Sequence, residues 1–115
     1  MRDFRQLDIW KQSLQYCILV YRTTDTYPSS EKFGMVPQMN RCAISIPSNI
    51  AEGCSRRTVI DFSRFLDISL GSSFELETQI EISHQLGYIS HENYLVMHKE
   101  LHILQKRINK FRISL

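Results

Sequence analysis

The sequence has 115 residues, of which 43% are hydrophobic and 23% charged, and a formal net charge of +2. This length supports one core, so we expect a single domain over residues 1–115, and the composition excludes disordered and fibrous proteins. No apolar run approaches the roughly 20 residues of a membrane span, and three widely spaced cysteines favour reduced thiols in the cytoplasm over a disulfide framework.

The first half of the chain shows the periodicity of two packed helices. Apolar residues recur at spacings of three and four, and the first core stripe would be Leu7, Trp10, Leu14, Cys17 and Tyr21. That helix should end within residues 23–30, where turn-forming residues cluster. A second helix is expected from Pro37, since proline is tolerated at the first helical position. Its stripe would be Met39, Cys42, Ile46 and Ile50, and residues 53–57 should turn the chain.

The second half predicts two further helices. Thr58 and Asp61 resemble a capping box at the start of a long helix over residues 59–86. Its seam would be Phe62, Leu66, Ser69, Ser73, Leu76, Ile80 and Ser83. Gly87 is the expected stop and Ser90 the expected cap of a fourth helix. The fourth seam would be Tyr94, Met97, Leu101, Leu104, Ile108 and Phe111. No segment alternates with a period of two, so we predict an all-α, antiparallel up-and-down four-helix bundle.

Five segments carry a family resemblance over nearly the whole chain. They are "DIW", "YPSSEKFGM", "QMNRCAISIPSNIAEG", "FSRFLDISLGSSFELETQIEIS" and "LGYIS". In this order the chain resembles the bacterial four-helix-bundle proteins known as 23S ribosomal RNA intervening-sequence proteins. The related accessory proteins of diversity-generating retroelements form pentameric barrels and work with a reverse transcriptase and its RNA. The resemblance therefore implies a homo-oligomer, a pentamer, and a reverse transcriptase or other protein as a partner.

One departure from the family pattern concerns the start of the second helix. The family usually has a Ser or Thr there as a helix cap, whereas this chain has Val36 and Pro37. This departure concerns the start of that helix and leaves the predicted bundle unchanged.

Polar residues lie beside the apolar stripe in the segment "SIPSNIAEG" and on the facing helix. The residues assigned to a polar network are Arg41, Asn49, Glu52, Glu75 and Gln79. Antiparallel packing of the two helices is expected to bring Arg41 or Gln79 to one of the two carboxylates, and Asn49 or Ser72 to the other. Such a half-buried network fixes the register of two helices when all its members have partners. Contact of these residues with a ligand is the alternative.

The sequence does not favour an enzyme. A di-metal bundle needs a Glu-x-x-His motif on each of two helices, and Glu81 to His84 supplies one such motif. His98 and His102 stand at i and i+4 but have no assigned acidic or cysteine partner. Cys54 beside Arg56 and Arg57 is a candidate for a lowered pKa, but no histidine is near it in the sequence. We therefore expect no catalytic residue, no metal and no cofactor.

The charges are expected to be polarised along the bundle. The end that holds both termini and the 53–58 turn has ten basic and five acidic residues, whereas the other half has four and seven. The candidate nucleic-acid-binding residues are Arg2, Arg5, Arg56, Arg57, Lys106, Arg107 and Lys110. A basic end attracts phosphate groups, which favours RNA or DNA as a partner. A protein-binding scaffold without nucleic-acid affinity is the equal alternative, because basic residues also favour helix C-termini.

Several apolar residues lie outside the predicted core stripes and suggest a homo-oligomer. Leu70 and Phe74 lie to one side of the third seam, flanked by Asp67, Glu77 and Glu81. Ile44, Pro47, Ala51 and Cys54 widen the apolar arc of the second helix. An apolar patch with an acidic rim is typical of an interface, so Ile44, Ala51, Leu70 and Phe74 are the predicted interface residues. The alternative is that Phe74 folds back over its own bundle.

Overall fold

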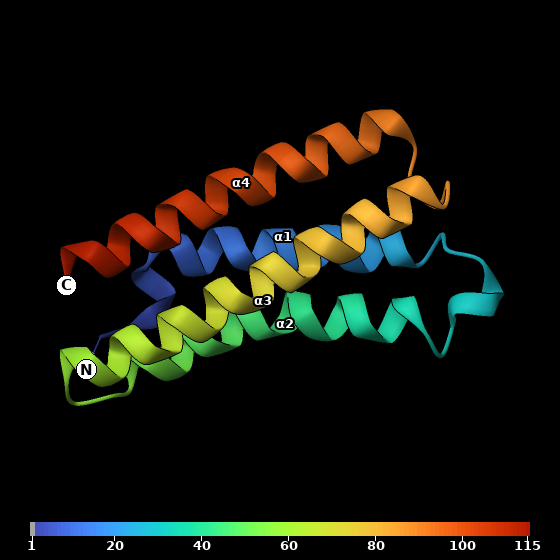
Figure 1. Ribbon diagram of the computed structural model, residues 1–115. Helices are drawn as coiled ribbons and strands as arrows, with labels where there is room; N and C mark the ends of the chain where they lie inside the picture. The colour runs from blue at the N-terminus through green and yellow to red at the C-terminus, as the bar shows by residue number, and fades with distance from the viewer. Residues whose placement is uncertain (1) are drawn as a thin grey trace.

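The computed structural model describes residues 2–115 as an assembly of four long helices (Figure 1). They are α1 (Asp8–Thr24), α2 (Met35–Cys54), α3 (Val59–Gln85) and α4 (His91–Ser114), with short 3₁₀ turns at Phe4–Gln6 (η1) and Ser29–Glu31 (η2). Successive helices run in opposite directions, and both chain ends lie beside the α2–α3 connection. Residues 2–115 contain no strand. The predicted all-α up-and-down bundle is confirmed.

The predictions for α3 and α4 agree closely with the structure. All seven residues of the predicted α3 seam are buried. The hydroxyl of Thr58 accepts the backbone N–H of Asp61 at 3.1 Å, and the hydroxyl of Ser90 accepts that of Asn93 at 3.2 Å. Gly87 has a φ of +79°, the left-handed conformation that ends α3 and that glycine adopts without strain. The polar signals at helix ends were sufficient to place these boundaries.

The predicted core stripe of α1 is wrong in part: Cys17 is buried and Leu7 and Trp10 pack against the core, but the other two predicted residues do not. Ile9, Ser13, Tyr16, Val20 and Thr24 are buried together with Cys17, whereas Leu14 and Tyr21 are exposed. Both stripes have helical spacing, and the buried one is the more polar. Its hydroxyls are satisfied within the protein: Ser13 donates to the Trp10 carbonyl, Tyr16 to the Met97 carbonyl and Thr24 to Asn40. Satisfied hydroxyls can be buried at little cost, so the apolar stripe turns partly outward.

The predicted start and stripe of α2 also need correction. The helix begins at Met35, two residues before Pro37, because the Glu31 carboxylate accepts the Met35 N–H at 3.0 Å. This hydrogen bond supplies the cap that Val36 and Pro37 do not, and it lowers the pKa of Glu31. Cys42 is half-buried instead of lying in the core, where Ala43 takes its place.

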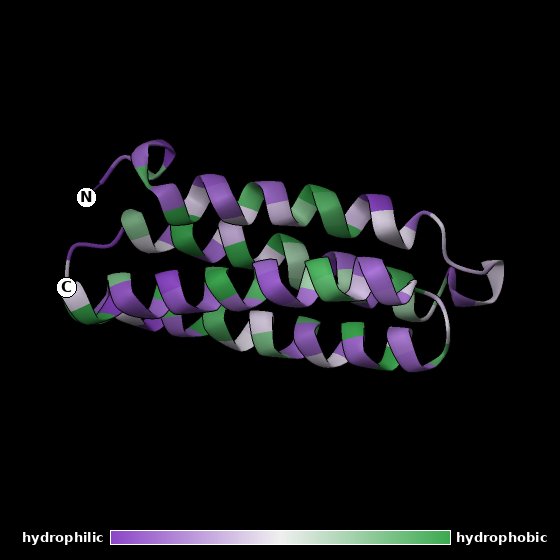
Figure 2. Ribbon diagram, turned by 90° about the horizontal axis from the view of Figure 1, so that it is seen from above, coloured by the Kyte–Doolittle hydropathy of each residue, from purple (hydrophilic) through white to green (hydrophobic). Residues whose placement is uncertain are grey.

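The helices pack in the order α1, α2, α3, α4 around one core. The most extensive packing joins α2 to α3, and the least extensive joins α1 to α4. Hydrophobic and hydrophilic residues occur along every helix (Figure 2), as amphipathic helices around a shared core require. Among residues 2–115, no helix is long and apolar enough to cross a membrane.

Candidate functional site

Serine residues join α2 to α3 at close range. The Ser45 and Ser72 hydroxyls lie 2.7 Å apart, and the fully buried Ser69 hydroxyl donates to the Ile46 carbonyl at 2.9 Å. Pro47, inside α2, has no backbone N–H to donate. The small side chains let the two backbones approach, and their hydroxyls stay satisfied. Ser69 lies in the core, whereas Ser45 and Ser72 line a polar groove on the outer side of the contact.

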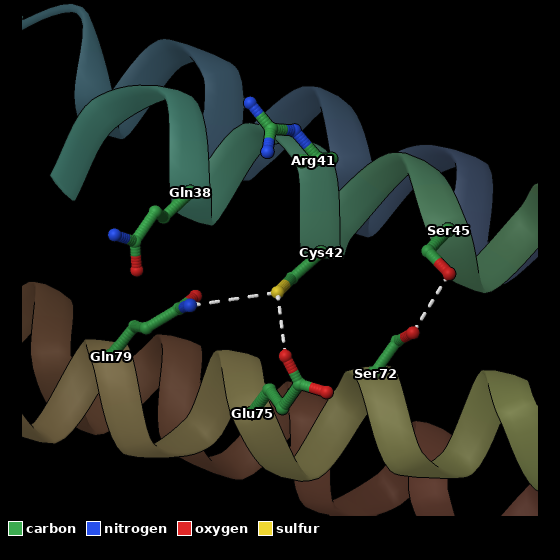
Figure 3. Close-up of a pocket in the computed structure, with 7 residues that line it drawn as sticks. All are labelled: Gln38, Arg41, Cys42, Ser45, Ser72, Glu75 and Gln79. Atoms are coloured by element: carbon green, nitrogen blue, oxygen red, sulfur yellow. Dashed lines mark hydrogen bonds between the residues drawn. The ribbon is translucent and has the colours of Figure 1, made fainter. Parts of the chain in front are cut away.

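The polar groove between α2 and α3 has a volume of about 350 Å³ (Figure 3). It is lined by Gln38, Arg41, Cys42, Ser45, Ser72, Glu75 and Gln79. The Cys42 thiol donates to the Glu75 carboxylate at 3.6 Å and accepts the Gln79 amide at 3.5 Å. Burial raises the pKa of Cys42, so the thiol keeps the proton that it donates. Most polar groups of this helix–helix contact are hydrogen-bonded, but the buried oxygen Gln79 Oε1 has no protein partner among the described residues.

The polar network differs from the predicted pairing. Asn49 stays within α2 and donates to the Ser45 carbonyl and hydroxyl at 2.8 and 2.9 Å. Glu52 pairs with Arg56 one turn later at 3.1 Å instead of reaching α3. The guanidinium of Arg41 points away from Glu75 (Figure 3). Arg41 is exposed, so water solvates its charge without a carboxylate partner.

Cys42 was missed as a member of this network because its spacing also fits the core stripe. Gln38, Cys42, Ser45 and Asn49 recur at intervals of four, three and four. Three of these four side chains are polar. This polarity indicates that the stripe faces a polar groove and not the apolar core, and it could have been recognised from the sequence.

The basic end gathers some of the candidate cations and separates others. Arg2, Arg56 and Arg57 surround one shallow depression beside Leu115, where the Arg2 N–H donates to the Cys54 carbonyl at 3.1 Å. Arg107 lies about two turns before the C-terminal end of α4, beside the groove between α1 and α4. Its guanidinium donates to the Gln12 side-chain oxygen at 2.8 Å. Of the remaining candidates, Arg5 lies on η1, and Lys106 and Lys110 are exposed on α4.

Most of these cations have no acidic partner. Of the seven candidates, Arg56 alone forms an ion pair within residues 2–115. Three of the arginines, including the ion-paired Arg56, lie over aromatic rings: Arg2 over Phe111, Arg5 over Phe4 and Arg56 over Phe65. Because arginines already occupy these ring faces, we expect no stacking of nucleobases on them.

The hypothesis of an activated Cys54 thiol is wrong. Cys54 is 2% exposed, and burial raises its pKa despite the opposing charge of Arg2. A buried thiol with a raised pKa is a poor nucleophile.

Two apolar patches lie on different sides of the bundle. The first, called the α1–α2 patch, consists of Leu14, Ile18, Tyr21, Ile44 and Ala51. Asn40, which is hydrogen-bonded to Thr24 of α1, precedes Ile44 by one helical turn, so Ile44 faces the α1 side. The predicted widening of this arc by Pro47 and Cys54 is wrong, because both are buried in their own bundle.

The second patch, called the α3–α4 patch, consists of Phe74, which is 56% exposed, and Leu70, one helical turn before it on α3. Leu70 is half-buried and packs against the core, so it is less exposed than predicted. The flanking acids contact α4: Asp67 pairs with Arg112 at 3.2 Å, and Glu77 accepts Gln105 at 2.8 Å. Phe74 therefore lies on the α4 side of α3, and it does not fold back fully over the bundle.

The comparisons with known proteins agree with this architecture. The sequence profile of the family described as "23S rRNA-intervening sequence protein" matches residues 5–110. The chain belongs to this family. A crystal structure of a protein of unknown function from the S23 ribosomal protein family of Bacteroides thetaiotaomicron superposes with a TM-score of 0.81 at 23% identity, covering 90% of this chain and 97% of that one. No curated protein matches.

In this 23S rRNA-intervening sequence protein, the family-like motifs build the contact between α2 and α3. Within "SIPSNIAEG", Asn49 binds α2 itself, and a side chain at Gly53 would collide with Phe62. Within "GSSFELETQ", Ser72 meets Ser45, and Leu76 is fully buried. These contacts support a structural role for the buried side of the two motifs. The basic end and the apolar patches, which include Ala51 and Phe74 on the outer side of the motifs, are the surfaces open to partners.

Proposed function

We propose that this protein is a non-catalytic, oligomeric helical bundle that binds RNA or DNA through its basic end. The observation that carries the proposal is the convergence of both chain ends and the α2–α3 connection, which gathers Arg2, Arg56 and Arg57 around one depression. Exposed arginines of this kind, of which Arg2 and Arg57 form no ion pair within residues 2–115, bind phosphate groups and release counterions. Contacts to phosphates carry no base information, so the binding is expected to be independent of sequence.

Charge reversal tests this proposal. Replacing Arg56, Arg57, Lys106 and Arg107 with Glu is expected to abolish the retention of RNA on a filter at low salt, because the phosphates then meet acidic side chains. For the wild-type protein, the logarithm of the binding constant should fall with the logarithm of the salt concentration, by roughly 0.7–0.9 per phosphate contact.

A matched control reverses the four cations of the other half, Arg22, Lys32, Arg41 and Lys99, which are all exposed. Both quadruple variants change the net charge equally, so RNA retention by the control variant would show that the location of the charge matters. Equal retention by the wild type and the basic-end variant would contradict nucleic-acid binding at this end. The remaining candidate would be the protein-binding scaffold, which the exposed apolar patches favour.

For the oligomer, we propose a closed ring in which the α1–α2 patch of one copy packs on the α3–α4 patch of the next. A symmetric dimer needs one self-complementary patch, whereas two different patches suit a head-to-tail contact that closes into a ring. Ile44 and Phe74 supply one exposed apolar side chain to each patch, 44% and 56% exposed. The number five comes from the family resemblance.

Two single variants and their mixture test the ring. Ile44→Glu and Phe74→Glu should each give a folded monomer by light scattering, because each places an unpaired carboxylate in one half of every contact. Each variant retains the patch that the other has lost, so a mixture of the two should form a heterodimer. If either variant alone kept the size of the wild type, or if the wild type were monomeric at micromolar concentration, the head-to-tail ring would be wrong.

The proposed setting of this function is the cytoplasm, where Cys17, Cys42 and Cys54 would remain reduced thiols, as they are in the structure. The resemblance to retroelement accessory proteins makes a reverse transcriptase with its RNA one candidate partner. Neither a cofactor nor a membrane is part of the proposal.

A further inference from the structure

His84, His91 and Tyr94 form a cluster at the end of the bundle opposite the basic end. His84 lies in the last turn of α3, and His91 is the first residue of α4. The fold brings His91 Nδ1 to within 3.2 Å of His84 Nε2. His98 and His102 continue along α4, with ring centroids 6.2 Å apart. The pair formed by His84 and His91 therefore joins two helices across the α3–α4 connection.

The separation of the two nitrogens suits a shared metal ion. Zinc binds imidazole nitrogen at about 2.0–2.1 Å, so two imidazoles at tetrahedral positions place their nitrogens about 3.3 Å apart. The observed 3.2 Å is close to this value. In the absence of an ion, one neutral ring can donate a hydrogen bond to the other, and a metal would take the place of that proton. His91 is exposed, so its ring can turn to direct a lone pair at the ion.

Neighbouring side chains hold His84 in place. The Tyr94 ring stacks on His84 with centroids 3.9 Å apart and planes inclined by 8°. The Tyr94 hydroxyl donates to the Glu81 carboxylate, which fixes the tyrosine on the α3 side of α4. The carboxylate also adds negative charge one helical turn from His84, and this charge attracts a cation. Part of the site is thus ordered before any ion arrives, and less side-chain entropy is lost on binding.

We propose that His84 and His91 form a binding site for a divalent transition-metal ion such as Zn²⁺, Ni²⁺ or Cu²⁺. Imidazole nitrogen is a preferred ligand of these ions. Within residues 2–115, no group of three or more His, Cys, Asp or Glu is arranged to hold a metal, so water fills the other coordination positions. The expectation of no metal from the sequence weighed the Glu81 to His84 motif and the pair His98 and His102, whereas the tertiary structure brings His84 to His91.

Isothermal titration calorimetry tests the site with NiCl₂ or ZnCl₂ and the full chain without a histidine tag. The wild-type protein is expected to bind one ion per chain. His84→Ala and His91→Ala should each weaken binding at least about tenfold, since loss of a ligand costs no less than loss of a supporting residue. His102→Ala is the matched control, an exposed histidine farther along α4, and should bind as the wild type does.

Thermal unfolding gives a second measurement. The ion bridges α3 and α4 in the folded state, so saturating metal should raise the melting temperature of the wild type and of His102→Ala but not of the other two variants. Two results would overturn the proposal: no saturable binding by the wild type up to millimolar metal, or binding that survives unchanged in His84→Ala or His91→Ala.

Discussion

Leu76→Asp is expected to abolish cooperative folding. Leu76 is 0% exposed and lies at the centre of α3, the longest helix. Truncating a buried leucine typically costs about 2–5 kcal/mol, and an unpaired carboxylate in the same space adds a desolvation penalty. The total reaches the roughly 5–15 kcal/mol by which small domains are stable. Circular dichroism should therefore show loss of helical signal and of the melting transition.

Leu95→Asp is the control for this variant. Leu95 is 52% exposed and lies in the second turn of α4, so an aspartate at this position stays solvated. The control should melt close to the wild type. A cooperative, fully helical Leu76→Asp protein would mean that the α3 seam does not form the core.

Gly53→Val is expected to destabilise the bundle by about 3 kcal/mol, which lowers the melting temperature by roughly 10 °C in a domain of this size. A Cβ atom at Gly53 would lie 2.8 Å from Phe62 Cδ1 and 3.0 Å from Phe65 Cβ. These distances are too short for non-bonded carbons, so α2 and α3 must move apart where they meet. Thermal unfolding followed by circular dichroism measures the effect.

Gly71→Ala serves as the matched control, because nothing lies within 4 Å of a Cβ atom at that position of α3. Alanine is a better helix former than glycine, and the substitution should stabilise the protein by up to about 1 kcal/mol. Equal melting temperatures for Gly53→Val and the wild type would contradict a steric role for Gly53. If Gly71→Ala were destabilising as well, the loss could not be assigned to the contact with Phe62.

The four-helix bundle and most of α3 and α4 could be predicted from the pattern of residues along the chain. Leu66, Leu76 and Ile80 recur at spacings that only a helix can bring to one side, and Ser69 and Ser73, which share that spacing, are buried on the same side. Thr58 and Ser90 could be recognised as caps because a cap depends on residues within one turn of itself. The gathering of basic residues at one end also followed from chain order and helix length alone.

Which stripe of α1 faces the core depends on contacts between distant parts of the chain. Tyr16 is buried because its hydroxyl reaches the Met97 carbonyl, 81 positions away in the sequence, and no local pattern shows that acceptor. The start of α2 likewise depends on the Glu31 carboxylate, which replaces the usual cap from outside the helix. The approach of His84 to His91 depends on how the α3–α4 connection closes. The spacing of residues along the chain determines which of them share a helix face. Which polar groups can be buried depends on partners on other helices, because a buried polar group is stable only when it is hydrogen-bonded.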